Sequence, residues 1–126
     1  IAQSPWRAEI TVLGYVEPAI RDALYARAAV FVYPSFYEGF GFAPLEAMQA
    51  RCPVITSLSS STAEVCGAGA LLVDPYNVRQ LAEAMAAILH DDHLAARLVN
   101  KGLDIIKQFD WSQSARRLTE VFYRLA

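Results

Sequence analysis

The sequence lacks an excess of charge of either sign. Eleven Lys and Arg stand against thirteen Asp and Glu, so the formal net charge of the 126 residues is -2. A nucleic-acid-binding domain typically carries a basic stripe on one face or along one helix. No such stripe is visible here, and the sequence therefore argues against nucleic acid as a partner.

Long hydrophobic runs are also missing. The longest apolar stretches, such as 28–32 and 67–73, are far shorter than the roughly 20 residues that a membrane-spanning helix needs. The chain opens with Ile-Ala-Gln-Ser, without the basic start and apolar segment of a signal peptide. Because an initiator Met is absent as well, we expect the chain to be a piece of a longer protein.

Cysteine is scarce, since only Cys52 and Cys66 occur. Two cysteines do not make a disulfide framework. Each sits beside apolar residues, where Cys usually behaves as a small buried hydrophobe. We predict structural burial rather than a redox or catalytic role. A reducing, cytoplasmic setting fits best, with membrane association through the parent protein left open.

Hydrophobic residues make up 55% of the chain, which is ample for one buried core. Short β-branched runs alternate with longer helical patterns in the first part of the sequence. The runs predict four strands, at 9–16, 30–33, 53–56 and 70–73. Helices are expected from Glu17-Pro18 and over 43–50. A Ser-rich loop over 57–62 and a short helical turn around Glu64 follow the third strand.

From residue 77 onward the pattern is helical to the end. Asn77 is placed to cap a first amphipathic helix, and Asp110 and Gln113 stand at capping-box spacing before the last. The apolar stripes of the three helices are Val78, Leu81, Ala82, Met85 and Leu89; Leu94, Leu98, Gly102 and Ile105; and Ala115, Leu118, Phe122 and Leu125. Strands alternating with helices predict an α/β fold, with a Rossmann-like parallel sheet covered by helices on both faces and three helices at the end.

The most promising position for chemistry is the loop that follows the strand at 30–33. In open α/β sheets, ligands bind outside the carboxyl ends of the strands. Gly39 and Gly41 let the backbone approach a ligand, and the following helix N-terminus favours an anion such as phosphate. Glu38 in the loop and Glu46 in the helix can face one site. A carboxylate accepts two sugar hydroxyls well, which suits ribose or a hexose.

Structural explanations of the same residues stand beside this one. Glu46 near a helix start is favourable with the helix dipole and needs no ligand. Gly39 and Gly41 can simply build a tight turn, and Gly-Phe-Gly is much less than the dinucleotide fingerprint G-x-G-x-x-G. From the residues alone, these alternatives stay open.

Aromatic and polar clusters elsewhere have mainly structural explanations. The aromatic residues of this region can stack a base, but for Tyr33 and Phe42 we favour the core. We expect Trp111 to pack the last helix onto the domain. His90-Asp91-Asp92-His93 falls between two amphipathic helices, where polar caps are expected, so no metal site is predicted.

The string EGFGFAPLE has seven residues between its two glutamates. It resembles the E-x7-E motif of the retaining glycosyltransferases of family 4, which have the GT-B fold of two Rossmann-like domains facing each other across a cleft. The resemblance continues through GYVEPAIRDALYARAAVFVYPSFYEGFGFAPLEAMQARCPVITS, ALLVDPYNVRQLAEAM and FDWSQSARRLTEVFY. It covers roughly residue 10 to the end.

The resemblance implies a role for each residue of the motif. Glu38, the catalytic candidate, would contact hydroxyls of the donor sugar. The backbone of Gly39, Phe40, Gly41 and Phe42 would lie against that sugar and its diphosphate. Glu46 would hold the ribose hydroxyls, with Ala43, Pro44 and Leu45 lining its approach. Such enzymes need no metal or other cofactor, because protein cations and helix amides stabilise the departing diphosphate.

The chain departs from the family pattern at several places. Many relatives carry Gly where Arg51 stands, and Ser61-Thr62-Ala63-Glu64 replaces a frequent Leu-Pro before the glutamate. The diphosphate-binding Arg and Lys of the family have no match in residues 1–7, and the acceptor-binding N-terminal domain is absent. Residues 1–126 therefore resemble the later part of the C-terminal, donor-binding half of a GT-B fold.

The leading hypothesis is a fragment of a hexosyltransferase, inactive by itself. Its parent would move a hexose from a nucleoside diphosphate sugar to a glycan, lipid or small acceptor with retention of configuration. A non-catalytic nucleotide-sugar-binding or scaffold domain of the same fold is the alternative. A flavodoxin-like signalling domain is a distant third, because no acidic cluster follows the first expected strand.

Overall fold

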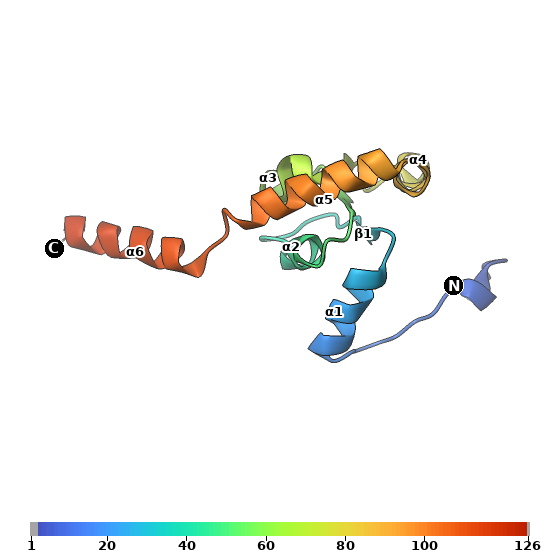
Figure 1. The fold of residues 1–126 in the computed structure, drawn as a ribbon, viewed down its shortest axis with the longest axis horizontal. Helices are drawn as coiled ribbons and strands as arrows, with labels where there is room; N and C mark the ends of the chain where they lie inside the picture. The colour runs from blue at the N-terminus through green and yellow to red at the C-terminus, as the bar shows by residue number, and fades with distance from the viewer. Residues whose placement is uncertain (1–2, 126) are drawn as a thin grey trace.

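The computed structural model describes residues 3–125. A short 3-10 turn, η1 (Arg7–Glu9), precedes the main domain (Figure 1). The elements that follow are α1 (Pro18–Arg27), β1 (Phe31–Tyr33), α2 (Phe42–Gln49), β2 (Val54–Ser57), α3 (Ser60–Cys66), η2 (Gly67–Gly69), β3 (Ala70–Val73), α4 (Val78–His90), α5 (Asp92–Ile106) and α6 (Trp111–Leu125). The three strands are parallel and lie in the order β1-β2-β3.

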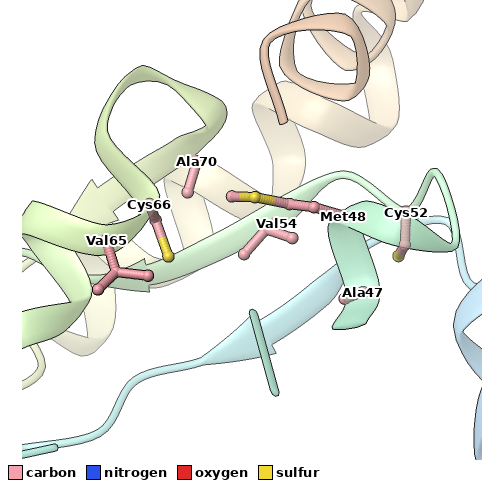
Figure 2. Packing of buried hydrophobic residues seen from close by; sticks show 7 residues of the cluster. All are labelled: Ala47, Met48, Cys52, Val54, Val65, Cys66 and Ala70. Atoms are coloured by element: carbon pink, nitrogen blue, oxygen red, sulfur yellow. The ribbon is translucent and has the colours of Figure 1, made fainter. Parts of the chain in front are cut away.

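Side chains leave the two faces of this sheet alternately, as they do in any strand. Phe31, Val54 and Ala70 stand side by side in register. Val54 and Ala70 belong to a buried cluster with residues of α2 and α3 (Figure 2), and Phe31 packs against it. The next row belongs to a second cluster on the opposite face, with residues of α4 and α5. Helices therefore cover both faces, and the predicted Rossmann-like fold class is confirmed.

Helix α2, on which the candidate site depends, packs closely against α5. At Gly102 of α5, an added Cβ would lie 2.9 Å from Cγ of Met48, which is 1% exposed. At Gly69 of η2, an added Cβ would lie 2.9 Å from the Cα of Gly102. These glycines allow a backbone approach that larger residues would prevent. The position of α2 is thus fixed by close packing on the sheet and on α5.

The strands expected at 30–33, 53–56 and 70–73 are confirmed, as are the three closing helices. Two local predictions of helix starts also hold. Pro18 is the first residue of α1, and the side chain of Asn77 accepts a hydrogen bond from the backbone N–H of Gln80 at the start of α4.

The strand expected at 9–16 is wrong. Residues 10–16 form no strand and lie away from the sheet, between η1 and α1 (Figure 1). Val12 and Tyr15 are 73% and 85% exposed. A strand needs a neighbour for its backbone hydrogen bonds, and within residues 3–125 this segment pairs with none. An apolar, β-branched pattern alone does not supply that neighbour.

Helix α6 extends away from the domain (Figure 1) and buries none of its residues. Trp111 is 82% exposed, so the prediction that it packs this helix onto the domain is wrong. The apolar stripe of α6 is real, with Leu118 and Phe122 on it, but it meets no apolar partner in the part of the chain that is described. No helix within residues 3–125 is long and apolar enough to span a membrane.

Candidate functional site

Glu38 lies in the loop that leaves the carboxyl end of β1, and its side chain is held by the last residue of that strand. The hydroxyl of Tyr33 donates a hydrogen bond of 2.6 Å to Oε1 of Glu38. This bond, with help from the Ser35 hydroxyl, holds the pKa of Glu38 below its ordinary value. The same bond raises the pKa of Tyr33. Glu38 is therefore a carboxylate oriented by a neutral phenol.

The backbone of this loop is fastened by serine hydroxyls at the end of the neighbouring strand β2 and just after it. Ser60 Oγ accepts from the backbone N–H of Glu38 at 2.8 Å and donates to its carbonyl at 2.9 Å, and Ser61 Oγ donates to the same carbonyl at 2.8 Å. Ser59 Oγ donates to the carbonyl of Phe36, and Ser57 Oγ to that of Ser35. A Ser-rich loop was expected at 57–62, but its contacts with the loop of Glu38 were not predicted, although two loops after adjacent parallel strands share one sheet edge.

The structure requires glycine at position 41 but not at position 39. Gly41 is the N-cap of α2 with φ +92°, and an added Cβ would lie 3.1 Å from Cγ2 of buried Thr62. A turn and a close contact therefore require glycine at 41. An added Cβ at Gly39 would meet nothing within 4 Å. The fold does not need glycine there, and the surface above Gly39 is open.

Helix α2 begins without a capping side chain, because Gly41 has none to offer. The first backbone N–H groups of a helix have no intrahelical partner. In α2 these groups are the backbone N–H groups of Phe42 and Ala43. Pro44, which has no N–H, is buried, and Leu45 packs against the core cluster. The start of α2 thus presents backbone amides to the surface while its apolar side chains hold it to the sheet.

The aromatic residues around this helix start divide between core and surface. Phe40 is partly buried, and its ring lies edge-on to Phe109 with a centroid distance of 5.6 Å. Phe42 is 61% exposed, so its prediction as a core residue is wrong. It occupies the first position of α2, and its ring centroid lies 4.7 Å from that of Phe40. Tyr33 is partly buried and uses its hydroxyl for Glu38.

Glu46 lies one turn into α2 and is paired with α1. Its Oε1 is 3.1 Å from Nη1 of Arg21, with both side chains more than one-third exposed. The pair lines a surface pocket of about 320 Å³, together with Asp22, Gln49 and Ala50. This pairing satisfies the Glu46 carboxylate in part and leaves it facing solvent.

A row of aromatic rings connects the surroundings of the two glutamates. Tyr25 of α1 lies edge-on to Phe31, with ring centroids 5.0 Å apart, and Phe31 stacks on Tyr33 at 5.9 Å. Tyr33 binds Glu38 at one end of the row. At the other end, burial and then the charge of Glu46 raise the pKa of Tyr25. The row of rings therefore runs from the surroundings of Glu46 to the phenol that binds Glu38.

The remaining candidates for chemistry have structural roles. Cys52 and Cys66 are buried free thiols, as predicted. Burial raises the pKa of both, that of Cys66 to about 11, which keeps them protonated and weakly nucleophilic. Asp91 caps α5 by accepting from the backbone N–H of Leu94. Within residues 3–125, no three His, Cys, Asp or Glu side chains gather as metal ligands.

The parallel sheet and the loop at its carboxyl edge define a Rossmann-like domain with an open surface above a helix start. A family model described as glycosyl transferases group 1 matches residues 1–104. The chain belongs to this family, as the resemblance in its sequence led us to expect.

Curated relatives are glycosyltransferases by name. The chain is 43% identical over 102 residues to the O-antigen chain mannosyltransferase B of Escherichia coli, an alignment that covers 81% of the chain and 27% of that protein. It is 32% identical over 120 residues to the phosphatidyl-myo-inositol mannosyltransferase of Mycobacterium leprae, an alignment that covers 93% of the chain and 32% of that protein. The chain thus spans about a third or less of the length of these relatives.

A solved structure shares the fold. The sucrose-phosphate synthase of Thermosynechococcus elongatus matches with a TM-score of 0.82 and 30% identity. The match covers 94% of this chain and 30% of the synthase chain. The arrangement of helices and strands described above therefore recurs within a larger glycosyltransferase-related protein, in agreement with the expected relation to the GT-B class.

Proposed function

We propose that residues 1–126 form part of the C-terminal, donor-binding domain of a retaining family 4 hexosyltransferase with the GT-B fold. The complete protein transfers a hexose from a nucleoside diphosphate sugar to a hydroxyl of a glycan or lipid-linked acceptor. Two relatives are named mannosyltransferases, which favours mannose as the hexose. The complete protein works on the cytoplasmic side, where nucleotide sugars are available.

The observation that carries this proposal is the arrangement of Glu38 and Glu46 around one loop and helix start. Glu38 stays ionised because Tyr33 stabilises its carboxylate. It accepts hydrogen bonds from hydroxyls of the donor sugar. Glu46 exchanges part of its contact with Arg21 for the ribose hydroxyls of the nucleotide. Charge-assisted bonds of this type are stronger than those between neutral groups.

The backbone between the two glutamates receives the rest of the donor. The open surface above Gly39 leaves room for the sugar and the diphosphate to approach. Uncapped amides at Phe42 and Ala43 provide hydrogen-bond donors for an anion, and the helix dipole adds to the attraction. Ala43, Pro44 and Leu45 line the approach to Glu46.

Stabilisation of the departing diphosphate needs more positive charge than this chain provides near the loop. We assign that charge to Arg or Lys residues in the rest of the complete protein, and expect no metal or other cofactor. The N-terminal domain supplies the acceptor site. Closure of the two domains brings donor and acceptor together and excludes water. The isolated chain therefore binds donor weakly and transfers nothing.

Turnover assays of the complete protein test this proposal. The protein is incubated with GDP-, UDP- and ADP-sugars and a set of glycan and lipid-linked acceptors, with and without EDTA. We expect transfer from one nucleoside diphosphate hexose, with retained anomeric configuration and no effect of EDTA. Product with none of the donors would favour a non-catalytic scaffold domain instead. Inverted product would contradict the assignment to a retaining enzyme.

A further inference from the structure

Ser60 has an unusual relation to Glu38. Its single hydroxyl accepts from the backbone N–H of Glu38 and donates to the backbone C=O of the same residue, at 2.8 and 2.9 Å. The two residues are 22 positions apart and follow different strands. Both backbone hydrogen-bonding groups of the candidate catalytic residue are therefore satisfied by one side chain at the start of α3.

The backbone of Ser60 adopts a left-handed conformation that a residue with a side chain rarely takes. Its φ is +57°, and among residues 3–125 only Arg51 shares a positive φ without being glycine. Side chains disfavour this region, whereas glycine enters it freely. A glycine at 60 would thus suit the backbone better. What serine adds at this position is the hydroxyl that holds Glu38.

We propose that Ser60 is a positioning residue that fixes the backbone of Glu38 and thereby aims the Glu38 carboxylate at the donor sugar. This inference rests on the proposed function. Tyr33 holds the carboxylate of Glu38, and Ser60, assisted by Ser61, holds its main chain. The side chain then has one orientation before the donor arrives. Preorganised groups of this kind contribute to rate through orientation rather than through affinity.

The strain at Ser60 makes the proposal separable from a merely structural role. In the complete protein, Ser60→Gly removes the hydroxyl and also relieves the backbone. Arg51→Gly is the matched control, because it relieves the same kind of strain at an exposed residue that makes no hydrogen bond to the loop. Ser60→Ala removes the hydroxyl and keeps the strain. All three variants are measured for Tm and for kcat and KM of the donor.

We expect Ser60→Gly to melt at or above the temperature of the parent, as Arg51→Gly does. Its kcat falls by about 10- to 100-fold, the size of effect that a misplacement near 1 Å produces. The KM for the donor stays within about twofold because Glu46 still holds the nucleotide. Ser60→Ala loses kcat similarly but melts lower. Arg51→Gly keeps both kinetic constants.

Two results would overturn the proposal. A Ser60→Gly protein with kcat within twofold of the parent would show that the hydroxyl does not position Glu38. A parallel loss of Tm, kcat and donor affinity would show a structural role only. Amide hydrogen exchange at Glu38 gives a readout that needs no turnover, and we expect at least tenfold faster exchange in Ser60→Gly. Unchanged exchange refutes the positioning. Absence of turnover in the parent protein, by contrast, refutes the proposed function.

Discussion

Replacing Gly39 by Ala distinguishes two explanations of this glycine, a loop that contacts a ligand and an ordinary turn. It is the sharpest test of the site. An added Cβ at 39 meets no atom within 4 Å, and the residue does not have a positive φ. Ala also lowers the conformational entropy of the unfolded chain, which stabilises a protein by about 0.4–1 kcal/mol at a compatible position. Gly39→Ala should therefore fold as well as the parent protein, or slightly better.

Gly41→Ala is the contrasting substitution, because the fold itself requires glycine there. With φ at +92°, a side chain costs about 1–2 kcal/mol. The new methyl would lie 3.1 Å from Thr62, which is 1% exposed and has little room to move. The entropy gain of about 0.4–1 kcal/mol is roughly cancelled by the added cost of this close contact. We expect a net loss of about 1–2 kcal/mol, or roughly 4–8 °C in Tm for a domain of this size.

Affinity for the donor decides between the two explanations of Gly39. Calorimetry of the complete protein with its donor should show at least a tenfold weaker Kd for Gly39→Ala, about 1.4 kcal/mol, because the methyl occupies space that the sugar and diphosphate need. Its melting temperature should not fall. If Gly39→Ala binds donor within twofold of the parent, the surface above Gly39 is solvent only, and the reasoning about the loop is refuted.

Three further substitutions test other parts of the site and its support. Glu46→Ala should weaken donor binding by about 1–3 kcal/mol through lost hydrogen bonds, and unchanged affinity by calorimetry would remove Glu46 from the site. Tyr33→Phe should raise the pKa of Glu38, which NMR titration of its carboxyl carbon measures. Because Tyr33 depresses this pKa in the folded parent, the Glu38 carboxylate of the variant should become protonated at a higher pH than in the parent. An unchanged titration curve would contradict this. Gly69→Ala should destabilise by about 1–3 kcal/mol in urea unfolding, since its methyl meets the backbone of Gly102; a parental midpoint would show that α5 can shift.

Local chemistry explains why most of the fold could be predicted from the sequence. Each of the three confirmed strands is a short apolar run ended by a polar or turn residue, and the sheet that they form lies between two layers of helices. Helix starts such as Pro18 and Asn77 depend on neighbours three or four residues away. The segment 9–16 shows where this reasoning stops. Its composition is equally typical of a strand, but pairing depends on a neighbouring strand that no local pattern reveals.

The candidate site likewise has features that a local sequence pattern predicts and features that it does not. The position of Glu38 in the loop after a strand and the helix start at Gly41 follow from local pattern. The contacts of Ser60 with Glu38 and of Arg21 with Glu46 join segments that are distant in the sequence, and they depend on the order of the strands. A serine-rich loop indicates hydroxyl donors but not the carbonyls that they reach. Geometry across neighbouring strands is therefore what the sequence alone left unpredicted.

The aromatic row lies between two carboxylates, Glu38 in the loop after β1 and Glu46 on α2. Phe31 is anchored in the core because it lies in register with Val54, and the rings of Tyr25 and Tyr33 contact it from either side. Glu38 accepts a hydrogen bond from the Tyr33 phenol, whereas Glu46 pairs with Arg21, so the two carboxylates have separate partners. Two carboxylates with separate partners can each accept a separate pair of hydroxyls, as a sugar linked to a nucleotide requires.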